Sequence, residues 1–165
     1  MNARAVALDI SSCDALLAIA RTQVDDGHTK QALQTVNQAI ALEPANALAL
    51  VFQAEMLALL GRVAEGGEAL QRAMQMDRLS PVVHNARNHW FMSVNQADSA
   101  AASGERAMRL DPSGARWRAN TAMAYAFGGH VDDAIRVCAI DEAAESCGTL
   151  WSSLARAAPR TPQWR

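Results

Sequence analysis

Residues 27–44 read GHTKQALQTVNQAIALEP, and this stretch has two copies further along the chain. Residues 61–78 read GRVAEGGEALQRAMQMDR, and residues 95–112 read NQADSAAASGERAMRLDP. Each copy starts with Gly or Asn, continues with alanines and larger apolar residues at helical spacing, and reaches an acid near its end. Corresponding residues are 34 positions apart, so the sequence predicts a chain built from copies of one unit.

Several positions of the unit repeat the same kind of residue at this step. They are, in chain order, Gly27, Gly61, Asn95 and Gly129; Ala39, Ala73 and Ala107; Ile40, Met74 and Met108; Leu42, Met76 and Leu110; and Glu43, Asp77 and Asp111. The Gly or Asn lies between two apolar helical segments, where a left-handed backbone is needed and Asn is the next best residue after Gly. Pro44 and Pro112 follow the acid, where proline stops a helix because it has no N–H to donate. Each unit is therefore predicted to be a hairpin of two helices.

The boundaries of the units follow from the position of the turn glycine. With this glycine placed fifteenth, the predicted repeats are 13–46, 47–80, 81–114 and 115–140. Ser12 and Ser80 each precede a predicted helix and are expected to cap it. Asp141 stands where the earlier repeats have alanine, so the fourth repeat is expected to end early, and an apolar pattern beyond it predicts a C-terminal capping helix. The predicted organisation is an N-terminal segment, 1–12, a helical domain, 13–140, the capping helix, 141–158, and a tail, 159–165.

The 34-residue helix-turn-helix unit resembles the tetratricopeptide repeat (TPR). Its second helix carries the family's Ala-x-x-x-large step as Ala32 with Val36 and as Ala134 with Cys138. The resemblance implies an all-α fold, a right-handed superhelical solenoid of helix-turn-helix hairpins that ends in the capping helix.

Two glycines depart from the TPR pattern. Gly66 replaces the alanine of this step in the second repeat, and Gly104 replaces the large residue in the third. Both changes remove side-chain volume from a position that normally packs, so looser packing is expected at these two points.

Composition limits the partners and the location. The net charge is −2 and the pI about 6.1, so no uniform positive field attracts nucleic acid. No apolar run approaches the ~20 residues that a membrane span needs, and the first residues contain no signal-peptide apolar region. Cys13, Cys138 and Cys147 have no zinc-binding spacing and are expected to be small buried residues in a reducing compartment. The expected location is the cytoplasm if the sequence is complete, and the periplasm or the outer membrane if a signal segment was trimmed.

The histidines and acids suggest no catalytic or metal site. His28 and His130 follow turn glycines and are expected to face solvent, whereas His84 and His89 point about 140° apart on one predicted helix. His130 lies near two acids, but acids in a first helical turn are favoured by the helix dipole alone. The sequence has no phosphate-binding glycine loop and no nucleophile with an identifiable base. We therefore expect no enzyme activity, no metal and no cofactor.

The first helices of TPR repeats line a concave groove that holds a peptide or a helix. The resemblance therefore implies a partner-binding groove formed by Leu17, Arg21, Val24, Leu48, Val51, Glu55, Leu59, Val82, Asn85, His89, Met92, Arg116, Met123 and Phe127. This set is largely aliphatic with scattered charge, which suits an apolar or amphipathic segment of another protein. The alternative is that several of these side chains only pack against the neighbouring repeat.

The expected function is a non-catalytic scaffold or adaptor that holds a segment of a partner protein in this groove. Residues 106–145 read RAMRLDPSGARWRANTAMAYAFGGHVDDAIRVCAIDEAAE and resemble the C-terminal part of the TadD-type proteins of Flp/Tad pilus assembly. The alternative is a type III secretion-type TPR chaperone for a translocator protein, a family that the chain also resembles. Trp151 and the low charge of the predicted capping helix leave self-association through that end open.

Overall fold

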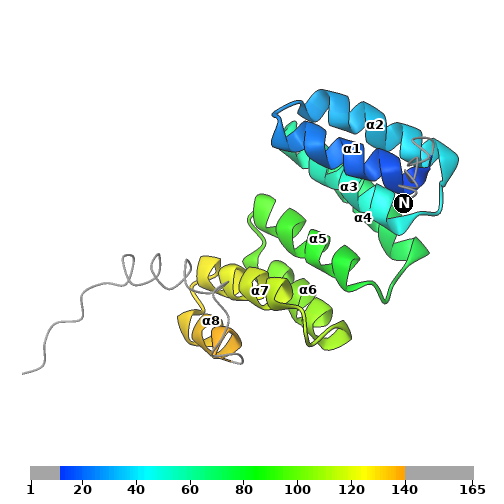
Figure 1. Ribbon diagram of the computed structural model, residues 1–165. Coiled ribbons are helices and arrows are strands. Elements are labelled where there is room, and N and C mark those ends of the chain that lie inside the picture. Colours follow the sequence, from blue (N-terminus) through cyan, green and yellow to red (C-terminus); the bar gives the residue numbers. More distant parts are fainter. Residues whose placement is uncertain (1–11, 140–165) are drawn as a thin grey trace, which may run out of the picture. The chain divides into compact units, whose positions relative to one another are not determined.

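The computed structural model describes residues 12–139, and within them every regular element is a helix (Figure 1). The first helices of the hairpins are α1 (Cys13–Asp25), α3 (Ala47–Leu59), α5 (Pro81–Ser93) and α7 (Ala115–Phe127). The second helices are α2 (Thr29–Leu42), α4 (Val63–Met76), α6 (Ala97–Leu110) and α8 (Val131–Cys138). Within each set the helices start 34 residues apart, so the period of the sequence is also the period of the helices.

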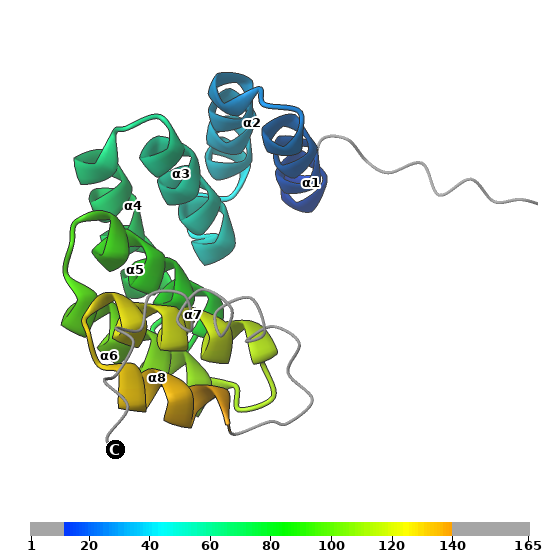
Figure 2. The same ribbon diagram turned by 90° about the vertical axis from the view of Figure 1, so that its left-hand side faces the viewer.

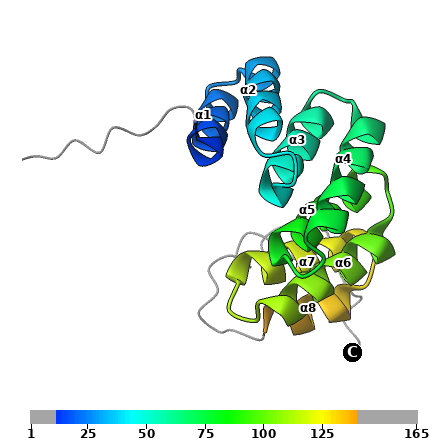
Figure 3. The ribbon, with the colours of Figure 1, turned by 90° about the vertical axis from the view of Figure 1, so that its right-hand side faces the viewer.

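The chain divides into two compact units. The first unit ends at Ala86 and the second begins at Arg87, so the boundary falls within α5. In the first unit α1 packs beside α2, α2 beside α3, and α3 beside α4 (Figure 2). In the second unit α7 packs against both α6 and α8 (Figure 3). These neighbouring helix pairs confirm the predicted all-α hairpin fold.

The turn inside each hairpin has the left-handed backbone that the sequence predicts. The φ angles are +81° at Gly27, +76° at Gly61 and +82° at Gly129, and Asn95 has a φ of +59° at the corresponding position. Asn tolerates this region better than most other residues with a side chain, which explains how it can take the place of glycine at this turn.

The predicted helix caps are also present. The Ser12 hydroxyl accepts a hydrogen bond from the Ala15 N–H at 3.2 Å, and the Ser80 hydroxyl accepts one from the Val83 N–H at 3.3 Å. Asn46 also caps α3, since its side chain accepts a hydrogen bond from the Ala49 N–H, and this cap is not among the predicted ones. Each of these bonds satisfies one of the N–H groups that a helix start leaves without a partner.

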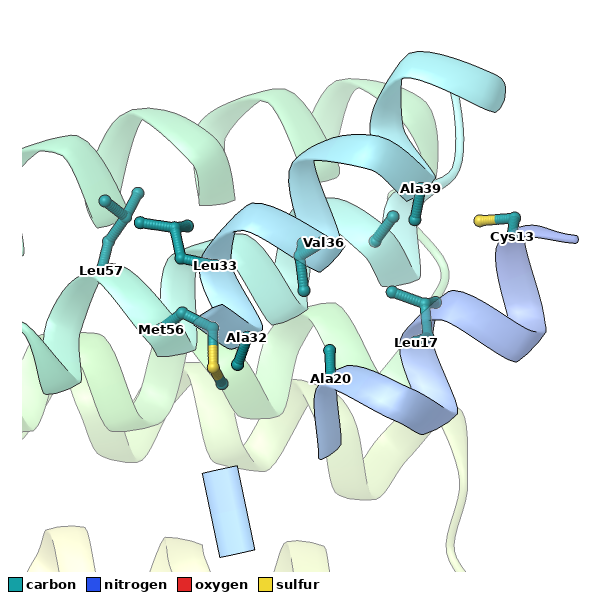
Figure 4. Close-up of a cluster of buried hydrophobic side chains, with 10 residues drawn as sticks. Cys13, Leu17, Ala20, Ala32, Leu33, Val36, Ala39, Met56 and Leu57 are labelled. Atoms are coloured by element: carbon teal, nitrogen blue, oxygen red, sulfur yellow. The ribbon is translucent and has the colours of Figure 1, made fainter. Parts of the chain in front are cut away.

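Large apolar side chains fill the core of the first unit. Figure 4 shows Leu17 of α1, Leu33 and Val36 of α2 and Leu57 of α3 gathered in one cluster. Val36 and Leu50 are completely buried. Burying an aliphatic side chain of this size contributes about 1.5–3 kcal/mol, so these residues are the main stabilising group of the unit.

The core of the second unit is made of smaller residues. Ala100 of α6, Ala122 and Ala124 of α7 and Ala134 of α8 are all fully buried. Each alanine buries little area, but the short side chains let neighbouring helices approach closely. The second unit therefore gains stability from close contact more than from large side chains.

Packing at Gly104 is tight, so the prediction of looser packing there is wrong. A Cβ atom at this position would lie 2.3 Å from the Thr121 Oγ1 and 2.9 Å from the Asn88 Nδ2. Asn88 and Thr121 are fully buried, and the Asn88 amide donates to the Ala100 carbonyl at 2.9 Å. These two polar side chains occupy the volume that a large residue fills elsewhere in the repeat.

The same prediction is wrong at Gly66. A Cβ atom there would lie 3.1 Å from the carbonyl oxygen of Ala54, because α4 approaches the backbone of α3. Glycine permits this close approach of two helices, since it has no side chain to separate them.

The cysteines divide into two cases. Cys13 is a free, buried thiol, and burial is the first cause that raises its pKa. Cys138 is buried as expected, but it is disulfide-bonded, so the expectation of a reduced thiol is wrong for this residue. The predicted capping helix, the tail, Cys147 and the self-association surface at Trp151 lie outside the described residues.

Candidate protein-binding surfaces

The structure divides the predicted groove residues by exposure. Leu17, Val51 and Asn85 are buried, and all three occupy the fifth position of their repeats. Val24, Glu55, Val82 and Met92 are half-buried. The exposed members are Arg21, Leu48, Leu59, His89, Arg116, Met123 and Phe127. The fifth position therefore packs the hairpins, and the other predicted positions are available to a partner to different degrees.

One face of α3 in the first unit carries a stripe of three apolar residues and one acid. Leu48, Phe52, Glu55 and Leu59 recur at spacings of four, three and four residues, which places them on one side of the helix. The stripe is about 17 Å long at 1.5 Å per residue. The guanidinium of Arg21, on α1, lies 5.8 Å from the centre of the Phe52 ring and adds a positive charge beside the stripe.

A cleft opens at one end of this stripe. Its volume is about 550 Å³, and it is lined by Ala45, Asn46, Ala47, Leu48, Met76, Asp77, Ser80, Val82 and Val83. The cleft brings together two predicted groove residues, Leu48 and Val82, which start successive first helices. Met76, at the end of α4, adds a third apolar wall and is 48% exposed. These side chains form a site large enough for part of a peptide.

The second unit carries a stripe with two apolar residues on the corresponding face of α7. Arg116, Met123 and Phe127 are separated by seven and four residues and share one face of the helix. Phe127 corresponds to Leu59 two repeats earlier, and both side chains are 63% exposed. Each unit therefore exposes a large apolar side chain to water at this position of the repeat.

The α5 side of the second unit contributes His89 and Met92. Met92 packs against the buried cluster that includes Ala124 of α7. His89 is exposed by area, but the surrounding protein desolvates its ring, and this desolvation followed by the positive charge of Arg116 lowers the pKa of His89. A neutral imidazole at neutral pH leaves Arg116 as the charged member of this predicted set in the second unit.

A polar pocket lies beside Phe127. It has a volume of about 440 Å³ and is lined by Asn95, Gln96, Ala97, Asp98, Ser99, Phe127, Gly128 and His130. The His130 Nε2 lies 3.2 Å from the Asp98 Oδ1, and both side chains are exposed. Phe127 therefore lies between the stripe on α7 and this polar pocket.

Sequence reasoning missed Phe52, Met76 and Asn46 as parts of these surfaces. Met76 belongs to a repeating apolar position at the end of the second helices, which includes Leu42 at 54% exposure. This recurrence of apolar residues just before the acid that ends each repeat is the sequence signal for an apolar surface at these helix ends. Asn46 could have been found as an N-cap, because it immediately precedes an apolar helix.

The described residues contain no cluster of three His, Cys, Asp or Glu side chains that could hold a metal ion. No helix among residues 12–139 is both long and apolar enough to cross a membrane.

The helix starts, the left-handed turn residues and the buried alanines all repeat with one period. Residues 17–81 match the tetratricopeptide-repeat family model. This TPR match runs from α1 to the start of α5 and confirms the resemblance for that part of the chain. No curated protein matches the sequence.

Solved structures extend the likeness over most of the chain. A thermophilic TPR protein from Thermus thermophilus is 21% identical, covers 89% of this chain and 84% of its own, and has a TM-score of 0.79. MamA is 18% identical, covers 90% of this chain and 83% of its own, and has a TM-score of 0.63. At these identities the likeness shows the fold alone, which is of the TPR type.

An enzyme is also among the similar structures. An O-GlcNAc transferase mutant from Thermobaculum terrenum is 20% identical, with a TM-score of 0.64. The match covers 76% of this chain but 23% of the transferase, so its activity does not transfer to this chain.

Proposed function

We propose that this chain is a non-catalytic interaction scaffold that binds an apolar or amphipathic segment of a partner protein. The observation that carries the proposal is the exposure of Leu59 and Phe127, two large apolar residues at the same position of the second and fourth repeats. A folded protein does not gain stability from exposing such side chains, and covering them by a partner removes apolar area from water.

The proposed contact residues are the accessible members of the predicted groove. In the first unit they are Arg21, Val24, Leu48, Glu55, Leu59 and Val82, and in the second unit His89, Met92, Arg116, Met123 and Phe127. Leu17, Val51 and Asn85 are buried, so we assign them to packing within the repeats. The positive charges of Arg21 and Arg116 next to apolar stripes favour a segment that carries acids beside its apolar residues.

Binding can be tested with charge substitutions in each stripe. The variants are Leu59→Glu and Phe127→Glu, and Ile19→Glu is the matched control because Ile19 is an exposed aliphatic residue of α1 outside the groove positions. Circular dichroism first shows that all variants are folded. A partner is then captured from native cell lysate, purified and titrated against each protein.

We expect each stripe variant to weaken binding at least about tenfold, equivalent to about 1.4 kcal/mol, because a carboxylate replaces a buried apolar contact. The control keeps the affinity of the original protein. Equal affinity for all variants would place the partner on another surface and end the groove proposal.

The finer role that we propose is in Flp/Tad pilus assembly, supported by the resemblance of residues 106–145 to TadD-type proteins. The alternative is a type III secretion-type chaperone for a translocator protein. The neighbouring genes separate the two, because pilus ATPase and secretin genes support the first role and needle and translocator genes support the second.

A further inference from the structure

The cleft between the starts of α3 and α5 lies close to the point where the chain enters α1. The Asn46 amide, which lines the cleft, donates to the Cys13 Sγ at 3.4 Å. Cys13 is the first residue of α1, and Ser12 before it caps that helix. Any residues that precede Ser12 therefore start next to one lip of the cleft.

The cleft itself has open apolar walls. Leu48 is 40% exposed and Met76 48% exposed, and Val82 is half-buried. The volume of about 550 Å³ lies within the range of about 300–1,000 Å³ typical of ligand pockets. This volume and these exposed fractions leave room for two or three aliphatic groups.

The sequence just before Ser12 has the composition that such a cleft accepts. Residues 5–10 read AVALDI, in which Val6, Leu8 and Ile10 alternate with Ala7 and Asp9. In an extended backbone this alternation places the three aliphatic side chains on one side and Asp9 on the other. From Cys13 back to Ala5 an extended chain spans about 26 Å, at about 3.3 Å per residue, which is longer than the α3 stripe.

We propose that residues 5–10 bind the cleft of their own chain, with Val6, Leu8 and Ile10 facing Leu48, Met76 and Val82. Only Ser11 and Ser12 separate the segment from α1, and a tether this short gives an effective concentration of about a millimolar. A contact whose Kd is below about a millimolar is therefore occupied more than half of the time. If the proposed function holds, the segment also competes with a partner for Leu48 and Val82, and so acts as a built-in inhibitor.

The first experiment uses the full chain with labelled methyl groups and no partner. We expect nuclear Overhauser contacts between the methyls of Leu8 or Ile10 and those of Leu48 or Met76, with intensities that a tenfold dilution does not change. Absence of these contacts overturns the proposal. Contacts that appear between differently labelled chains and fade on dilution show instead that a second copy supplies the segment, and also overturn it.

A pair of variants gives an independent readout. Leu8→Asp is expected to release the segment and shift the methyl signals of Leu48, Met76 and Val82, whereas Ala7→Asp, on the opposite side of an extended segment, leaves them in place. Equal effects of the two substitutions, or none from either, contradict the proposed orientation. Neither experiment contains a partner, so a failure here does not bear on the scaffold function.

Discussion

The two units build the same helix hairpin around different cores. Both units bury alanines, but the first also buries many Leu, Val and Met side chains, whereas the second buries Asn88, Ser103, Arg118 and Thr121. The helices nevertheless start at the same 34-residue step in both. The comparison teaches that the repeat does not require one set of core residues, because volume lost at one position can be regained from another helix.

The largest expected effect lies in the first unit. Leu50→Ala removes a fully buried side chain and is expected to lower the free energy of unfolding by about 3 kcal/mol, since it creates a cavity. Arg118 occupies the same position two repeats later, where its guanidinium donates to the Pro112 carbonyl at 2.7 Å. Arg118→Ala is expected to lower the free energy of unfolding by about 1.5 kcal/mol, because it removes this hydrogen bond. Urea unfolding followed by circular dichroism measures both, and equal costs would mean that the two cores do not differ in energy.

The second prediction concerns Gly104, where the repeat pattern and the structure disagree. The pattern suggests that Gly104→Leu restores a missing core residue and stabilises the protein. The structure predicts a loss of about 2 kcal/mol, because the new side chain overlaps Thr121 and Asn88. The midpoint of urea unfolding decides between the two, and a higher midpoint for the variant would show that the second unit is loosely packed.

A combined variant tests whether the compensation is local. Asn88→Ala and Gly104→Leu introduce the residues that the first unit has at the matching positions, Ala54 and Leu70. Thr121→Ala is added to them because a side chain at position 104 would also meet Thr121. We expect this triple variant to recover most of the stability lost in Gly104→Leu, since residues in contact do not act additively. No recovery would mean that the two polar side chains stabilise the unit in another way.

The sequence predicted the hairpins because their signals are local. Gly27 and Asn95 mark turns, and Ser12 and Ser80 mark helix starts, each through its own backbone preference. The packing at Gly104 was not predictable in the same way, because its partners are 16 and 17 residues away and the fit depends on all three residues.

The binding surfaces were predictable only in part, for a related reason. The TPR resemblance names the helix positions that can face a groove, but burial depends on the side chains of neighbouring helices. The fifth position faces inward at Leu17 and Val51, while the thirteenth faces solvent at Leu59 and Phe127. The cleft at Leu48 and Val82 forms from residues on three elements, so no single helix pattern reveals it.

The third prediction compares Tyr125 with Leu57, which holds the same position in the first unit. Tyr125 donates a hydrogen bond to the Glu105 carboxylate at 2.5 Å, and burial followed by Glu105 raises the pKa of Tyr125 to about 12. Because the pKa is raised in the folded state, neutral Tyr125 stabilises the folded protein fully below pH 10, the ordinary tyrosine pKa. This stabilisation is lost as the pH rises from 10 toward 12. The chain has one tyrosine, so phenolate absorbance reports this residue alone.

At pH 10 we expect Tyr125 to remain neutral in the folded protein, while half of it is ionised in urea. Glu105→Gln lowers the folded value but leaves it above 10, because burial is the larger cause. Half ionisation at pH 10 in the folded protein would contradict the hydrogen bond that joins α6 and α7.

The smallest effect is expected at the loop before α7. The Asp111 carboxylate accepts hydrogen bonds from the Ser113 hydroxyl at 2.6 Å and the Trp117 indole N–H at 2.8 Å, and these two bonds, in that order, are the main causes that lower the pKa of Asp111. Because the pKa of Asp111 is lowered in the folded state, its carboxylate stabilises the protein at pH values above the ordinary carboxyl pKa. This stabilisation is lost as the pH falls through the folded-state pKa. Asp111→Asn should therefore flatten the loss of stability at acid pH, measured by urea unfolding at several pH values.

The control is the matched substitution Asp77→Asn in the first unit, where the Asp77 carboxylate accepts a hydrogen bond from the Leu79 N–H. It tests whether the effect of the carboxylate hydrogen bonds is specific to the second unit. If Asp77→Asn flattens the profile as much as Asp111→Asn, the indole bond does not distinguish the two loops, and the difference between the units is confined to their cores.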